Sequence, residues 1–192
     1  MITKMYSLQE IIHHYYPISA EAFQKIAALV TKVEMPKKTI VFNPKQYEAK
    51  FYFIAKGSAR VYIIDDEGNE VSYILFLEKD YLLSFDGYLH QKPSYEYIEL
   101  LEDSILYELN TEDLKHLYET DLELANFGRV LADKFAYYTE SRFIDRLSLS
   151  ATARYLKLIE TYPEIVQRIP LKYIASYLGI TQVSLSRIRA KI

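Results

Sequence analysis

The sequence has no cysteine among its 192 residues. Disulfides, thiolate-held zinc, cysteine-ligated iron–sulfur clusters and thiol-based redox sensing are therefore excluded. Glycine is scarce as well, and its five residues are too scattered to make a phosphate-cradling loop or a dinucleotide-binding fingerprint. These absences argue against a nucleotide-hydrolysing or Rossmann-type enzyme.

Long hydrophobic runs are missing too. No run approaches the length of a membrane span, and the segment from Met1 to Met5 lacks the apolar stretch of a secretory signal. Half of the residues are hydrophobic and 26% are charged, which is ordinary for a globular protein. We therefore expect a cytoplasmic protein that has no membrane partner.

The four histidines, His13, His14, His90 and His116, are spread over three separate segments. Metal sites on β-rolls usually take two histidines from one strand with a carboxylate nearby, and the expected strands contain no histidine. No serine lies in a nucleophile-elbow motif. We expect no metal, no cofactor and no catalytic residue, and hence a protein that is not an enzyme.

The hydrophobic period changes twice along the chain. The stretch through Val30 is predicted to be helical, with Ser19 as a cap. Short β-rich runs separated by turn residues follow, and they predict a jelly roll or barrel. These runs are Thr39 to Phe42, Phe51 to Ala55, Ala59 to Ile64, Val71 to Leu77, Tyr95 to Leu101 and Ser104 to Leu109.

After Thr111, a candidate cap, the pattern becomes helical again, and one long helix is predicted from about Leu122 to Leu149. Its apolar residues recur at three- and four-residue steps. A helix of this length is longer than a domain of this size usually buries, so we expect it to reach a second subunit. The alternative is a pair of helices, broken at Gly128, that pack on the β-domain.

The segment from Leu171 to Arg189 has the pattern of a helix-turn-helix. Ile174, Ala175 and Leu178 fit the buried side of a first helix, and Gly179 suits the sharp turn. Thr181 is a good cap for the second helix, whose Leu185 and Ile188 point inward. From Ile165 onward the charge is +5 with no acidic residue, which leaves −8 on the rest of the chain. The alternative is a helical hairpin with a solvated basic face.

A leading helix, a β-roll, a long helix and a terminal helix-turn-helix together resemble the Crp/Fnr family of bacterial transcription regulators. The most specific stretches are Phe53 to Tyr62, Asp65 to Glu70, Arg154 to Leu156 and Tyr173 to Arg189. The resemblance implies an α+β fold: an N-terminal antiparallel double-stranded β-helix (jelly roll) with flanking helices at 1–120, a dimerisation helix at 121–149 and a small all-α DNA-binding domain at 150–192. It also implies a homodimer on double-stranded DNA, with RNA polymerase and an unknown small-molecule effector as further candidate partners.

The second helix of the motif carries the expected DNA contacts. Glutamine suits adenine, arginine suits guanine, and hydroxyls near a helix N-terminus suit phosphate. The expected DNA-binding residues are Thr181, Gln182, Val183, Ser184, Ser186, Arg187, Arg189 and Lys191. The sequence ends directly after this helix, without the β-hairpin wing of many family members, so we expect modest non-specific affinity. The alternative function is a ligand- or protein-binding β-roll module that has lost DNA binding.

The resemblance fails at the nucleotide pocket. Cyclic-nucleotide binders of the family use a Gly-Glu pair and an Arg followed by Ser or Thr, and these positions fall here on Leu83-Ser84 and Ser94-Tyr95. Ser94 cannot offset the lost hydration of a cyclic phosphate. We therefore expect cAMP and cGMP not to be effectors, and we expect the roll to bind an uncharged or largely apolar ligand, or nothing. The resemblance places Tyr137 and Tyr138 at the pocket, where large aromatic side chains can fill the cavity. The expected pocket residues are Leu82, Leu83, Ser84, Phe85, Ser94, Tyr95, Tyr137 and Tyr138.

Overall fold

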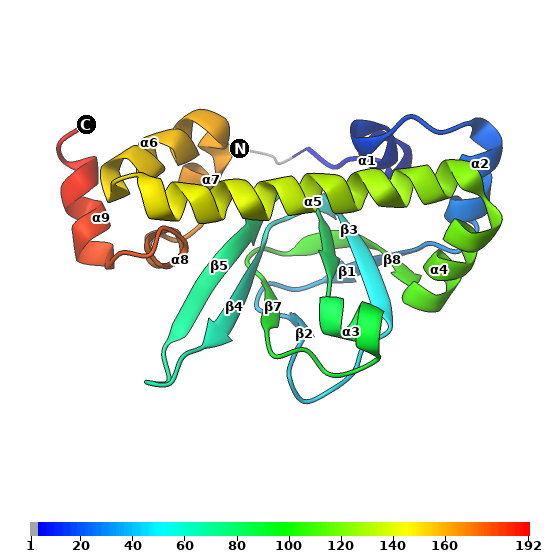
Figure 1. Ribbon diagram of the computed structural model, residues 1–192, viewed down its shortest axis with the longest axis horizontal. Helices are drawn as coiled ribbons and strands as arrows, with labels where there is room; N and C mark the ends of the chain where they lie inside the picture. Colours follow the sequence, from blue (N-terminus) through cyan, green and yellow to red (C-terminus); the bar gives the residue numbers. More distant parts are fainter. Residues whose placement is uncertain (1–3) are drawn as a thin grey trace.

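One long helix, α5 (Leu122–Ser148), runs along the whole molecule and joins a β-roll to a group of short C-terminal helices (Figure 1). The computed structural model describes residues 4–192. Helices gather at the two ends of α5, and the strands lie beneath its middle (Figure 1). The predicted fold class, an α+β fold with an antiparallel roll, is confirmed.

The roll consists of two four-stranded sheets that face each other, with strand orders β1-β8-β3-β6 and β2-β7-β4-β5. Every pairing between neighbouring strands is antiparallel. Alternate residues of both sheets point inward and form an apolar core that includes Ile54, Val61 and Ile98. The strands are β1 (Thr31–Met35), β2 (Ile40–Phe42), β3 (Lys50–Lys56), β4 (Ala59–Ile64), β5 (Glu70–Phe76), β6 (Tyr81–Leu83), β7 (Tyr97–Leu100) and β8 (Ser104–Asn110).

Two of these strands were not predicted. β1 lies at the edge of its sheet, and its charged Lys32 and Glu34 stay exposed, so its apolar alternation is weak. β6 has only three residues, too few to show a period. The six predicted strands match observed ones to within two residues at each end.

The N-terminal stretch is helical as predicted, but it is divided into two helices, α1 (Leu8–Tyr15) and α2 (Ala20–Ala27), and the second ends at Ala27 instead of Val30. Tyr16 precedes Pro17 and is extended, with φ −156° and ψ 128°, because proline disfavours helical backbone in the residue before it. Ser19 caps α2 as predicted: its hydroxyl accepts a hydrogen bond from the Ala22 amide.

Helix α4 (Thr111–Thr120) begins one residue away from the predicted cap. Asn110 is the cap, and its side chain accepts the Glu112 amide, whereas Thr111 is buried inside the first turn. Helix α5 then runs unbroken through Gly128, so the broken-helix alternative is wrong. Gly128 is there for a close approach, because a Cβ atom at this position would lie 2.6 Å from the Tyr118 ring.

Four short helices complete the chain, α6 (Ala151–Thr161), α7 (Pro163–Arg168), α8 (Leu171–Tyr177) and α9 (Gln182–Arg189). Their buried residues share one apolar cluster with Leu75 and Leu101 of the roll. Helix α8 lies against β5. Because of this shared core, the C-terminal helices are docked on the roll. One more short helix, α3 (Phe85–His90), lies within the roll.

Candidate nucleic-acid interface and ligand pocket

Helices α8 and α9 lie where the sequence predicts a helix-turn-helix, and a sharp turn joins them. Gly179 has a φ of +68°, and its amide donates to the Ser176 carbonyl at 2.9 Å. The Ile180 amide donates to the Ala175 carbonyl at 3.0 Å. This pair of hydrogen bonds is a Schellman motif, which ends α8 sharply and needs a left-handed residue at the glycine position. Thr181 then caps α9, since its hydroxyl accepts the Ser184 amide at 3.1 Å.

Helix α9 is held by Leu185, which is fully buried, and by the half-buried Ile188. The rest of the helix faces outward, and Gln182, Val183, Ser186 and Arg187 line a shallow depression with Ala190. Arg187, Arg189 and Lys191 are exposed, and none forms an ion pair with any residue from 4 to 192. Ser184 differs from its neighbours, because it is half-buried and its hydroxyl lies 2.9 Å from that of Thr181.

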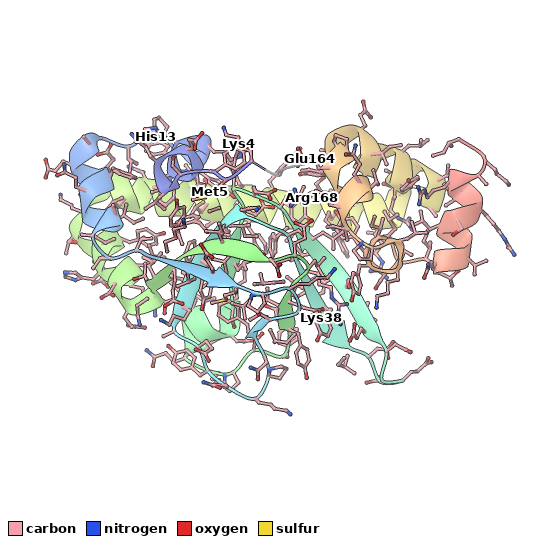
Figure 2. The ribbon with its side chains drawn as sticks, turned by 180° about the vertical axis from the view of Figure 1, so that it is seen from behind. Lys4, Met5, His13, Lys38, Glu164 and Arg168 are labelled. Atoms are coloured by element: carbon pink, nitrogen blue, oxygen red, sulfur yellow. The ribbon has the colours of Figure 1, made fainter. Side chains whose placement is uncertain are left out.

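Arg168 does not belong to this basic face, although it contributes to the +5 charge. Its guanidinium donates to both oxygens of Glu78 at 2.7 Å and to Glu102 at 2.5 Å. It lies with Glu164 where the C-terminal helices meet the roll (Figure 2). The two carboxylates raise the pKa of Arg168. Arg168 therefore joins the two parts of the chain, and its charge is neutralised there.

Arg60 makes a second junction that the sequence did not reveal. It is buried in the roll, with its guanidinium bonded to Glu99 at 2.7 Å and to Glu70 at 2.5 Å. Its two faces are covered by the rings of Tyr62, at 4.0 Å, and of Tyr173 from α8, at 3.8 Å. Nearby, the Ser72 amide donates to the Ser176 hydroxyl at 2.8 Å. Only the tertiary fold brings these residues together, so no local sequence signal could have identified them.

A cavity of about 480 Å³ opens between the roll and α5. This volume lies within the usual range for small-molecule sites. Four predicted pocket residues line it: Leu83, Phe85, Tyr95 and Tyr138. The expectation that aromatic side chains fill this space is wrong, because Tyr138 turns its hydroxyl toward Tyr177, at 3.3 Å, and leaves the cavity open.

The other four predicted residues do not line this cavity. Leu82 is fully buried in the core between the sheets. Ser84 caps α3, and Ser94 accepts the Glu96 amide at 3.1 Å, so both hydroxyls serve the local backbone. Tyr137 is 73% exposed on another face of α5. These four residues were assigned to the pocket from their positions along the chain, and position alone does not determine the direction of a side chain.

Sequence reasoning missed the charged lining of the cavity, which includes Glu96, Arg142 and Arg146. Burial raises the pKa of Glu96 to about 7, well above the usual range of a glutamate. Arg142 is half-buried on α5, where burial is the largest cause that lowers its pKa. The sequence could have indicated Arg142 as a cavity residue, because it lies one helical turn after Tyr138, which was predicted to line the pocket.

Comparison with known proteins agrees with this architecture. Residues 32–121 match the family model described as cyclic nucleotide-binding domain. No curated protein sequence matches the chain significantly.

Solved structures share the fold over nearly the whole chain. The c-di-GMP-responsive global regulator CLP of Xanthomonas campestris superposes with a TM-score of 0.70 at 18% identity, covering 90% of this chain and 91% of CLP. FixK2 of Bradyrhizobium japonicum gives 0.70 at 17% identity, covering 84% and 83%. A transcriptional regulator of the Crp/Fnr family from Eubacterium rectale gives 0.71 at 19% identity, covering 93% and 87%. The chain therefore has the fold of these regulators.

Two kinds of feature are absent from residues 4–192. No helix in this range is both long and apolar enough to cross a membrane. Within the same range, no group of three histidine or acidic side chains is placed to hold a metal ion.

Proposed function

We propose that this protein, which has a cyclic nucleotide-binding domain and the fold of Crp/Fnr-type transcription regulators, is a homodimeric, cytoplasmic regulator that binds double-stranded DNA through α9. RNA polymerase and a small-molecule effector are its further proposed partners. The proposed effector binds without the arginine that holds the cyclic phosphate in nucleotide-binding members of the family.

The unpaired basic face of α9 carries this proposal. Its cations have no protein carboxylate to neutralise them, so a polyanion that releases counterions is the natural partner. In this scheme Gln182, Ser186 and Arg187 contact base edges together with Val183, and Arg189 and Lys191 contact phosphate. Thr181 and Ser184, at the N-terminus of the helix, lie near phosphate. The two hydroxyls are bonded to each other and that of Thr181 also caps the helix, so the helix amides supply most of that contact.

The dimer is proposed from the second face of α5. Tyr137, Phe143, Ile144 and Leu147 are between 52% and 73% exposed. Their spacing places them on one side of the helix, opposite the stripe of Leu124, Phe127 and Leu131 that faces the roll. An exposed apolar stripe of this kind favours pairing with the same stripe of a second chain around a two-fold axis.

DNA binding can be tested with a randomised duplex library, followed by anisotropy titrations of the selected duplexes at several salt concentrations. We expect selected sites with two-fold symmetry and half-sites about one helical turn, roughly 34 Å, apart. Affinity should fall steeply with log salt. Ile144→Asp should give monomers by light scattering and lose the preference for paired half-sites.

The alternative is a β-roll module that has lost DNA binding, favoured by Val183, an apolar residue that is 61% exposed on the proposed reading face. It predicts no enrichment of any duplex and no salt-dependent binding at low ionic strength. A dimer that fails both assays would support the module.

A further inference from the structure

A second cavity, of about 420 Å³, lies between α5, α6 and α8. We call it the junction groove. Five cationic side chains line it: Lys134, Arg142, Arg146, Arg154 and Lys157. One carboxylate, Asp145, lines it as well, and it is paired with Lys157 at 2.7 Å. The groove therefore carries a concentrated positive charge.

The remaining cations have no acidic partner. Among residues 4–192 no carboxylate forms an ion pair with Lys134 or with the three arginines. Like charges this close destabilise one another unless an anion lies between them. Burial is the largest cause of the lowered pKa of Arg142; Tyr138 and Asp145 oppose it, and the charges of Arg146 and Arg154 add to it. The positive charge of the groove lining is therefore not balanced by the carboxylates of the described chain, and a bound anion would balance it.

Two of the arginines are already fixed in position. Arg142 donates to the Tyr177 carbonyl at 3.0 Å and lies 3.4 Å from the centre of the Tyr177 ring. Arg154 donates to the carbonyls of Leu149, at 2.6 Å, and Leu178, at 3.0 Å. Its Nε atom is buried and has no hydrogen-bond partner in the described chain. A fixed guanidinium with a spare donor is suited to a planar or tetrahedral oxyanion.

We propose that the junction groove binds a small phosphate monoester with an aromatic or apolar body, unlike the cyclic diesters, which carry one charge and have no terminal phosphate. A phosphate ester carries up to two negative charges and three acceptor oxygens, which suits several unpaired cations better than a single carboxylate does. The remaining walls are largely aromatic, with Tyr137, Tyr138 and Tyr162, so the body of the ligand would contact rings. This site is separate from the DNA-reading face and does not depend on DNA binding.

The location gives the ligand a route to the helix-turn-helix. Arg142 and Arg154 bind the carbonyls of Tyr177 and Leu178, which close α8 just before the Gly179 turn. A phosphate that engages the same two arginines would fix the end of α5 against the first helix of the motif. Occupancy of the groove would thereby set the orientation of α9 relative to the roll.

Calorimetric titration of the full-length protein with phenyl phosphate tests the proposal. We expect saturable binding, and a loss of at least about tenfold in affinity for Arg146→Gln, which removes an exposed cation that makes no internal hydrogen bond. Arg154→Lys keeps the charge but loses the paired N–H donors of the guanidinium group, and it should also weaken binding. Arg129→Gln, on the same helix but outside both cavities, should bind like the wild type.

Two further arms locate the site and its ligand. His90→Ala changes a residue that lines the roll cavity and not the groove, and it should leave binding unchanged. Loss of binding in this variant, or no saturable heat from the wild type, would overturn the proposal. So would an Arg146→Gln variant that loses DNA affinity while the wild type ignores phenyl phosphate, since the cations would then serve the DNA backbone.

Discussion

The guanidinium of Arg60, on strand β4 of the roll, lies 3.8 Å from the centre of the Tyr173 ring, on the first helix of the helix-turn-helix. Arg60 is almost completely buried, and its charge is balanced by Glu99 and Glu70. The ring therefore covers a buried, fully paired cation. This contact fixes α8 against the roll and makes the position of α9, the helix proposed to read DNA, depend on the roll.

Tyr173→Leu should weaken this junction without unpairing Arg60. We expect a loss of about 1–2 kcal/mol in the free energy of unfolding, the usual range for a desolvated cation–π contact. Urea denaturation measures it. Lys172→Met removes only the exposed cation 4.6 Å from the same ring and should change stability by about 0.5 kcal/mol or less. Equal effects of the two variants would show that the buried contact contributes nothing.

Arg168→Gln should be more damaging, because Glu78 and Glu102 would then face each other without a cation. The side chain of Glu78 is only 5% exposed. Breaking a buried pair from one side usually costs about 3 kcal/mol or more. The matched control is Arg129→Gln, whose pair with Asp133 is exposed and is worth about 0.5 kcal/mol. Chemical denaturation of both variants should separate the two values clearly.

Two cations of the reading helix should behave differently on DNA. Arg187→Ala should cost about 1–3 kcal/mol in binding and relax the preference at one base pair, whereas Lys191→Ala should weaken all sequences alike. The reason is position: Arg187 lies beside Gln182 and Val183, and Lys191 follows the end of the helix. Anisotropy titrations on matched and mismatched duplexes measure both. Sequence-independent losses for the two variants would remove the base contact from Arg187.

Cyclic nucleotides should not bind the roll cavity. By the family resemblance Ser94 is expected at the position of the phosphate-binding arginine, and its hydroxyl already accepts the Glu96 amide. Calorimetry with cAMP and cGMP at millimolar concentration should give only heats of dilution, and neither nucleotide should raise the melting temperature. Micromolar binding would mean that Arg142 or Arg146 has replaced the missing arginine.

Glu96 should make stability fall as pH rises. Burial raises its pKa from 4.5 to about 7 in the folded chain. Between these two values the unfolded chain loses the proton and the folded chain keeps it, so the free energy of unfolding decreases through this window. Glu96→Gln stays neutral and should show a shallower decrease when thermal unfolding is followed from about pH 5 to about pH 8. Parallel pH curves for the two proteins would contradict the assignment.

The turn between α8 and α9 could be predicted from the sequence because its determinants are local. Gly179, Thr181 and Leu185 act within one turn and one helix, so their spacing carries the whole signal. The β-strands that alternate clearly were equally accessible. Pro17 also indicates a break between α1 and α2. The prediction overlooked it because the hydrophobic period is helical on both sides of the proline.

The pocket was less accessible because its walls come from distant segments. Ser94 and Tyr137 lie at expected positions along the chain, but their side chains point elsewhere. The junctions at Arg60 and Arg168 bring together residues from the roll and the C-terminal helices. The segment charge of +5 includes Arg168 as if it were a free cation. Only the fold shows that Glu78 and Glu102 neutralise it.

Because α5 is unbroken, a change in its angle at one end is transmitted to the other end. Its 27 residues make a rigid rod about 40 Å long. A tilt of about 5° at one end displaces the other by roughly 3.5 Å, close to the rise of one base pair. A proline or a glycine kink along the rod would let the two ends move independently. Without one, a change of angle too small to disturb the roll is enough to shift α9 by about the rise of one base pair relative to the DNA that it is proposed to bind.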